Sequence, residues 1–84
     1  MKIEKATDIL HEIVEHLGGQ LREHYSGRGM FGRTCLGIVT DSPKLVISAA
    51  ERRRIVGASI DNMGLSYIVY WRSLDTTKKE EAVK

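Results

Sequence analysis

Apolar residues in the first part of the chain recur at steps of three and four positions. This spacing places them on one face of an amphipathic helix, with acidic side chains off that face. The helix is expected to end at Gly18-Gly19, because glycine readily adopts the left-handed conformation that closes a helix C-terminus. The apolar stripe comprises Ile3, Ala6, Ile9, Leu10, Ile13, Val14 and Leu17.

Two strands joined by a glycine-rich loop are predicted next. Residues 20–26 are short and polar, which is typical of an edge strand, and simple alternation places Tyr25 on the side opposite Arg22. Residues 33–40 form a more apolar strand. Because the loop of residues 27–32 is short, the two strands should pair antiparallel.

A second helix and a third strand complete the predicted fold. Asp41 or Ser42 can cap a helix and Pro43 suits a first helical turn, so a helix is expected over residues 44–56. Residues 58–64 are expected to form a loop, and residues 65–72, rich in β-branched and aromatic residues, to form the strongest strand. The pattern predicts an α+β fold, a two-layer α/β sandwich of order α-β-β-α-β. Both helices cover one face of a three-stranded, mainly antiparallel sheet.

The last predicted strand is apolar on both of its faces. A sheet covered by helices on one face alone should alternate apolar and polar residues. Aromatic residues left beside water form the kind of patch that marks an interaction site. The strand therefore predicts a homodimer interface, unless it is a central strand whose aromatic rims are covered by loops and the tail. The interface residues would be Tyr67, Ile68, Tyr70 and Trp71.

Length and composition limit the remaining possibilities. With 84 residues the chain has room for one domain, which we place at residues 1–74, and the charged residues 75–84 are expected to be a disordered tail. No apolar run is long enough to span a bilayer or act as a signal peptide, so a cytoplasmic protein with no membrane partner is expected. A single cysteine, Cys35, allows no intramolecular disulfide and suits a reducing compartment.

The positive charge of the chain comes mostly from arginine. Residues 18–74 carry seven arginines and one lysine against four acidic residues. Arginine binds phosphate and carboxylate bidentately, so an anionic partner is favoured, although the charge is below that of dedicated nucleic-acid binders. The run of residues 52–54 is interpreted as a solvated helix face, and the alternative is a phosphate-contacting helix.

Gly27, Gly29 and Gly32 form the pattern G-x-G-x-x-G. In dinucleotide-binding folds a helix follows this pattern, whereas a strand is predicted here. One interpretation is a hairpin loop that needs glycine at positive φ angles. The other is an anion site in which loop amides, Arg28 and Arg33 hold a phosphate of a nucleotide or nucleic acid.

A second polar segment precedes the last predicted strand. Asp61 and Asn62 are ordinary turn residues before a glycine, or they bring a carboxylate close to Arg28 if both connections lie at the same end of the sheet. The complete set of candidate ligand-binding residues is Tyr25, Gly27, Arg28, Gly29, Met30, Gly32, Arg33, Asp61, Asn62 and Met63.

Two short motifs resemble those of a known family. Residues 25–32 read Y-S-G-R-G-M-x-G, residues 61–64 read D-x-M-G, and residues 68–71 read I-V-Y-W. The chain resembles, over residues 20–72, a family of small bacterial and phage proteins with no established activity. The resemblance implies a phage or mobile-element origin and a shared site at Tyr25, Arg28, Met30, Asp61 and Met63. It implies no catalytic role.

The expected function is therefore binding, with catalysis disfavoured. No nucleophile, base and orienting group occur in a supporting motif, the histidines lack metal-binding spacing, and Cys35 is expected to be a small buried residue. No metal site and no cofactor are predicted. The first hypothesis is a small protein that self-associates through its sheet, with its protein partners unknown. The alternative is a binder of a phosphate-bearing ligand, through residues 27–32 and the arginines.

Overall fold

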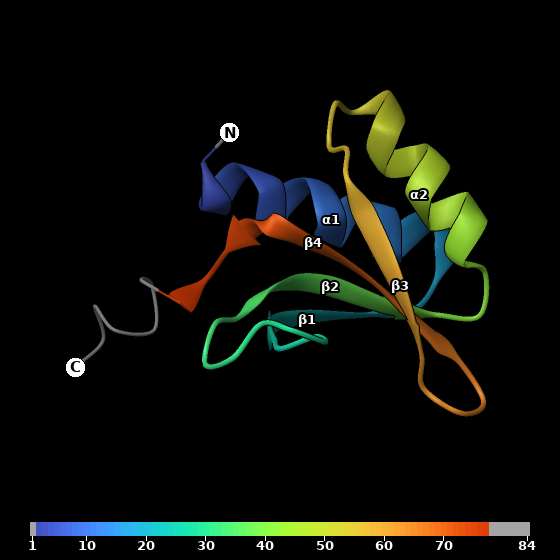
Figure 1. The fold of residues 1–84 in the computed structure, drawn as a ribbon. Helices are drawn as coiled ribbons and strands as arrows, with labels where there is room; N and C mark the ends of the chain where they lie inside the picture. Colours follow the sequence, from blue (N-terminus) through green and yellow to red (C-terminus); the bar gives the residue numbers. More distant parts are fainter. Residues whose placement is uncertain (1, 78–84) are drawn as a thin grey trace.

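A computed structural model describes residues 2–77 and shows two helices and one four-stranded sheet (Figure 1). The α+β class is confirmed, and the sheet has one strand more than predicted. All strand pairs are antiparallel, and the spatial order of the strands is β1-β2-β4-β3. In chain order the elements are α1 (Ile3–Leu17), β1 (Gln20–Tyr25), β2 (Cys35–Thr40), α2 (Pro43–Arg52), β3 (Ala58–Asn62) and β4 (Tyr67–Asp75).

The additional strand, β3, lies where a loop was predicted. Ser59 pairs with Tyr70 and Asp61 pairs with Ile68, so β3 forms a regular hairpin with β4. Alanine, aspartate and asparagine have low β propensity, and β3 has a single large apolar residue, Ile60. The segment is a strand because β4 provides a partner, which the local sequence does not show.

Both helices pack on the same face of the sheet, as predicted (Figure 1). Apolar side chains of the two helices meet those of the central strands β2 and β4, and Trp71 is fully buried among them. This burial of apolar surface is the main stabilising contribution to the fold. The main core comprises Ala6, Leu10, Ile13, Leu36, Ile38, Val46, Ala49, Ala50, Ile55, Val69, Trp71 and Leu74.

The first helix ends where it was predicted to end, whereas the ends of α2 and β4 differ from the predicted ones. α1 ends before Gly18, whose φ of 81° lies in the left-handed region, as expected. α2 is shorter than predicted, since the chain turns away at Arg54, which has a φ of 67°. β4 continues through Asp75, and the buried Thr76 donates its backbone N–H to the carbonyl of Thr34. The rest of the predicted tail, residues 78–84, lies outside the described residues.

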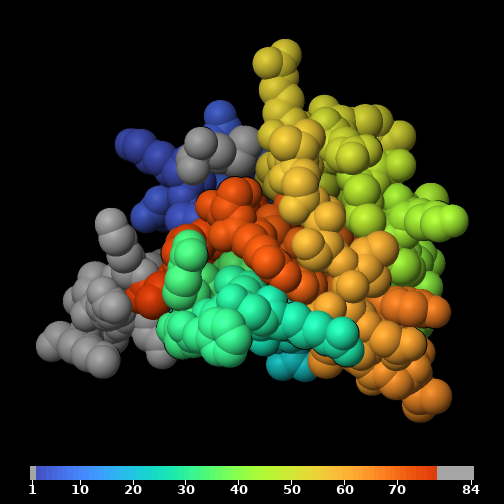
Figure 2. All heavy atoms as spheres, in the orientation of Figure 1, coloured from blue at the N-terminus to red at the C-terminus, as the bar shows by residue number. Residues whose placement is uncertain are grey.

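The other face of the sheet, which we call the open face, is covered in part by the β1–β2 loop. In Figure 2 this loop (teal to green) lies against β4 (orange-red). Met30 packs there with Cys35, Ile68 and Tyr70 in a second, smaller core. Within residues 2–77, neither helix is long and apolar enough to cross a membrane.

This second core changes the interpretation of the predicted interface. Ile68, Tyr70 and Trp71 are buried within the single chain, and Tyr67 alone is substantially exposed, at 40%. The strand is apolar on both faces because each face has its own core. These three side chains therefore provide no exposed surface for self-association, and the homodimer stays a prediction that needs another surface.

Candidate ligand-binding site

The glycine-rich loop is built from two successive turns. Met30 donates its N–H to the carbonyl of Gly27 at 3.2 Å, and Arg33 donates its N–H to the carbonyl of Met30 at 2.6 Å. Gly29 and Gly32 have φ angles of 75° and 77°, which side chains rarely adopt. The hairpin-loop interpretation therefore accounts for both of these glycines.

Gly27 is required for a different reason, namely close packing. A Cβ atom at this position would lie 2.7 Å from Cε2 of Tyr70, so a side chain has no room. The amide of Gly27 also lies 3.2 Å from Sδ of Met30, to which it donates, and that sulfur lies 3.9 Å from Sγ of Cys35. The loop thus packs on the open face, and Met30 is the side chain that covers Cys35.

Two of the arginines around this loop, Arg33 and Arg72, bond to other groups of the chain. Arg33 forms an ion pair with Asp75 through Nη2 at 2.8 Å. Hydrogen bonds from Thr77, and then from Arg33, lower the pKa of Asp75 to about 2. Arg72 donates to the carbonyl oxygen of Arg28 at 2.9 Å and thereby attaches the loop to β4.

Tyr25, Asp61 and Tyr70 form a hydrogen-bonded group on the open face. The Tyr25 hydroxyl donates to Oδ2 of Asp61 at 2.7 Å, and the Tyr70 hydroxyl lies 3.5 Å from Oδ1. The two tyrosine rings are tilted by 57°, with centroids 5.1 Å apart. Burial, and then the hydrogen bond to Asp61, raises the pKa of Tyr25 to about 12, so its hydroxyl is neutral at ordinary pH.

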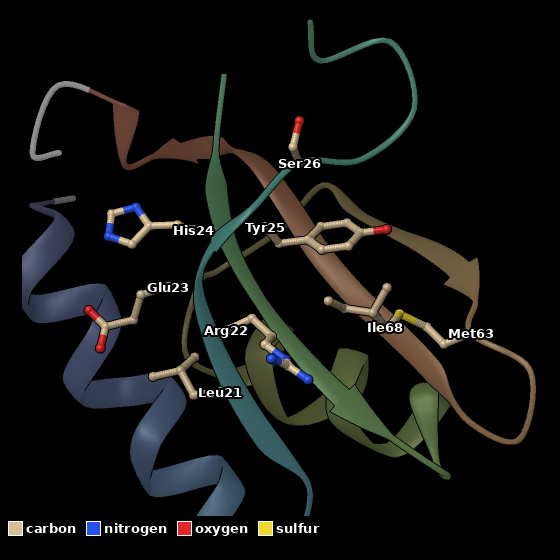
Figure 3. A pocket seen from close by; sticks show the side chains of 8 residues that line it. All are labelled: Leu21, Arg22, Glu23, His24, Tyr25, Ser26, Met63 and Ile68. Atoms are coloured by element: carbon tan, nitrogen blue, oxygen red, sulfur yellow. The ribbon is translucent and has the colours of Figure 1, made fainter. Parts of the chain in front are cut away.

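An open cavity of about 610 Å³ lies beside this group, and we call it the open-face cavity (Figure 3). Arg22 and Tyr25 project from β1 toward Ile68 and Met63, whereas Leu21 projects from the other side of the strand. A cation, an aromatic ring and the thioether of Met63 therefore line the same cavity. The lining residues are Leu21, Arg22, Glu23, His24, Tyr25, Ser26, Met63 and Ile68.

A β-bulge explains why Arg22 and Tyr25 share a face. Arg22 pairs with Gly37 and Tyr25 with Cys35, so three steps along β1 match two steps along β2. The extra residue reverses the alternation, which had placed these two side chains on opposite faces. Alternation alone therefore missed Arg22 as a site residue, and no bulge is evident from the sequence.

The candidate ligand residues divide into two groups. Tyr25 and Met63 line the cavity, and Asp61 holds Tyr25. Asn62 is a turn residue, since its Oδ1 accepts the N–H of Gly64 at 2.7 Å. Of these two neighbouring residues, only Asp61 contacts Tyr25, the residue at the end of β1. The remaining candidates belong to the loop and are absent from the cavity lining: Gly27, Arg28, Gly29, Met30, Gly32 and Arg33.

Cys35, the single cysteine of the chain, is buried. Burial raises the pKa of the Cys35 thiol to about 11, so this thiol is protonated and a poor nucleophile. Within residues 2–77, no group of three or more histidine, cysteine, aspartate or glutamate side chains is placed to hold a metal ion.

Comparison with known proteins adds no functional residue to this site. No protein-family model matches the chain, and neither the curated proteins nor the solved structures gave a significant match. The geometry of the open-face cavity is therefore the basis for the functional proposal.

Proposed function

We propose that this chain is a small, non-catalytic binding protein whose open-face cavity takes a phosphate-bearing ligand of the size of a nucleotide. The observation that carries the proposal is the position of Arg22. No other side chain among residues 2–77 forms a hydrogen bond or ion pair with its guanidinium group, which projects from the same side of β1 as Tyr25 (Figure 3). The cation is therefore available to an anionic ligand.

The cavity combines the contacts that such a ligand needs. A guanidinium group binds phosphate through two parallel hydrogen bonds. The ring of Tyr25, held by Asp61 and Tyr70, provides a fixed surface on which a base can stack. The thioether of Met63, which lines the same cavity, adapts to the shape of an aromatic ligand.

The glycine loop is a weaker candidate for the phosphate contact. The amides of Gly27, Met30 and Arg33 already donate hydrogen bonds within the loop. The guanidinium of Arg33 is paired with Asp75. Fewer amides therefore remain for an anion than the glycine pattern alone suggested.

Isothermal titration with the four common nucleoside monophosphates and a short single-stranded oligonucleotide tests the proposal. We expect at least one of these probes to bind, with an affinity that falls as salt rises, because a phosphate contact is screened. Arg22→Gln should weaken binding by about tenfold or more, since a charged hydrogen-bond pair is lost. Arg28→Gln is the matched control and should leave the affinity unchanged.

The outcomes separate the alternatives. A loss of affinity in Arg28→Gln with none in Arg22→Gln would move the phosphate to the glycine loop. Absence of binding to every probe by the unmodified protein would reject the proposal. If both variants lose affinity equally and circular dichroism shows that both are folded, the ligand responds to the overall positive charge of the protein. That result would also reject a site at the cavity.

A further inference from the structure

Exposed apolar side chains gather at one edge of the sheet. Eight large apolar residues within residues 2–77 are exposed by 40% or more, and two of them, Leu17 and Phe31, lie elsewhere. Three of the others lie on β3 or near its ends: Ile60 within it, Val56 before it and Leu65 after it. Leu45 of α2 and Tyr67 of β4 line one cavity, and Met63 lines the open-face cavity. These six residues are Leu45, Val56, Ile60, Met63, Leu65 and Tyr67.

The backbone of β3 offers hydrogen bonds on its outer side. Met63 donates its N–H to the carbonyl of Ser66 at 2.9 Å, which makes these two residues a hydrogen-bonded pair at the end of the hairpin. In an antiparallel ladder hydrogen-bonded pairs alternate with non-bonded pairs. The N–H and C=O groups of Ala58, Ile60 and Asn62 therefore point away from β4, along an edge that pairs with no other strand of the described sheet.

This edge has little of the protection that the other edge has. β1 carries a bulge, and charged side chains such as Arg22 and Glu23. β3 has a regular register and contains no lysine or proline, and its one charged side chain, Asp61, is held on the open face by Tyr25. An edge strand that lacks such devices offers its unpaired backbone groups to another strand.

We propose that a second copy of this chain pairs antiparallel along β3, about a two-fold axis at Ile60. In this register each Ile60 lies opposite Ile60 of the second copy, and Ala58 lies opposite Asn62. The outward N–H and C=O groups of each copy then bond to those of the other, and the two sheets become one continuous sheet. Asp61 lies opposite Ser59, so the two carboxylates do not face each other.

The placement of the exposed residues favours a second copy as the partner. Val56 precedes β3 and Leu65 follows it, at the tip of a hairpin that projects from the body of the molecule (Figure 1). Antiparallel pairing brings the start of one strand beside the end of the other, so Val56 of each copy lies next to Leu65 of the second. A surface that is self-complementary about a two-fold axis is the requirement for an isologous dimer.

The pairing buries apolar side chains together with strand backbone. Val56, Ile60 and Leu65, at this edge, are each exposed by 45% or more, and a group of exposed apolar residues usually marks an interaction site.

Sedimentation equilibrium on the full chain tests the proposal. We expect a dimer at about 0.1 mM protein, with Ile60→Lys weakening dimerisation by at least about tenfold, because it places two like charges at the two-fold axis. Leu65→Lys should also weaken it, and because Leu65 is fully exposed this change removes no packing within one copy. Phe31→Lys, at a residue 93% exposed on the β1–β2 loop, is the matched control and should leave the dimer intact.

Amide hydrogen exchange gives a second readout. The amides of Ala58, Ile60 and Asn62 should exchange slowly in the dimer and quickly in Leu65→Lys. If Ile60→Lys does not fold, the exchange rates of these three amides in Leu65→Lys test the proposed pairing instead. A monomeric unmodified protein at about 0.1 mM, or a dimer that Leu65→Lys leaves unchanged, would overturn the proposal. Neither residue lines the open-face cavity, so this test is independent of ligand binding.

Discussion

The hydroxyl of Tyr25 and the carboxylate of Asp61 lie 2.7 Å apart, although they belong to the two edge strands of the sheet. In a flat sheet of this order the two edges would be separated by about 14 Å. The bond therefore crosses β2 and β4 on the open face and ties one edge of the sheet to the other. It also fixes the ring that forms one wall of the open-face cavity.

We expect Tyr25→Phe to lower the free energy of unfolding by about 1–2 kcal/mol, because the partly buried carboxylate of Asp61 loses its shorter hydrogen bond. Urea denaturation measures the change. Tyr67→Phe is the control, since this exposed tyrosine has no hydrogen-bond partner among the described residues, and it should change the stability little. Equal effects of the two substitutions would show that the bond to Asp61 contributes nothing.

Gly27→Ala should destabilise the protein by about 1–3 kcal/mol, because the added methyl group overlaps the ring of Tyr70 and the loop must move. Gly29→Ala serves for comparison. It has open space around its Cβ position, and only the left-handed backbone opposes the change, at a cost of about 1 kcal/mol. Thermal unfolding of both variants compares the two costs. A Gly27→Ala protein as stable as the unmodified one would mean that the loop does not pack on Tyr70.

Met30→Ala is expected to uncover Cys35. Met30 is 6% exposed and contacts this thiol, so its removal leaves a cavity and costs about 2 kcal/mol or more. Labelling of the native protein with a thiol reagent at neutral pH should become faster by several-fold. The neighbouring Phe31→Ala, at an exposed position, should leave the rate unchanged. Equal labelling rates in the unmodified protein and Met30→Ala would contradict the role of Met30 in covering Cys35.

The stability contributed by Asp75 should depend on pH in acid. Its pKa falls from the ordinary value of 3.8 to about 2 in the folded chain. A lowered folded pKa means that the carboxylate stabilises the fold above about pH 4 and that this contribution is lost as the pH falls toward 2. The difference in unfolding free energy between the unmodified protein and Asp75→Asn should therefore be constant near neutral pH and shrink below about pH 4. If the difference in unfolding free energy between the two proteins stayed constant below about pH 4, Asp75 would not stabilise the fold through its charge.

The elements with strong local patterns were predictable from the sequence. α1 has an unbroken apolar stripe and ends at a glycine pair, so local information determines both its type and its end. β3 lacks such a pattern, because Ala58, Asp61 and Asn62 are poor strand formers and pairing with β4 makes the segment a strand. The sequence therefore predicts the class and the helix layer, but not the number of strands.

The site was predictable in part. Tyr25, Asp61 and Met63 were singled out by their motifs, and the structure brings them together at one end of the open face. Arg22 was missed because the bulge reverses the alternation of β1. Ile68 and Tyr70 were placed either in an interface or under covering loops, and they are buried because Met30 of the loop packs on them. Period-two alternation alone does not decide between these alternatives.

The strand order has a consequence for the synthesis of the chain. β4 is synthesised after the other three strands of this sheet, yet it lies between β2 and β3 and contributes Trp71 to the main core and Tyr70 to the smaller one. Until residues 67–75 emerge, β3 has no partner strand, Met30 lacks Ile68 and Tyr70, and α2 lacks the strand on which it packs most. Neither core is therefore complete before β4 is present, and a nascent chain that stops earlier leaves apolar side chains exposed.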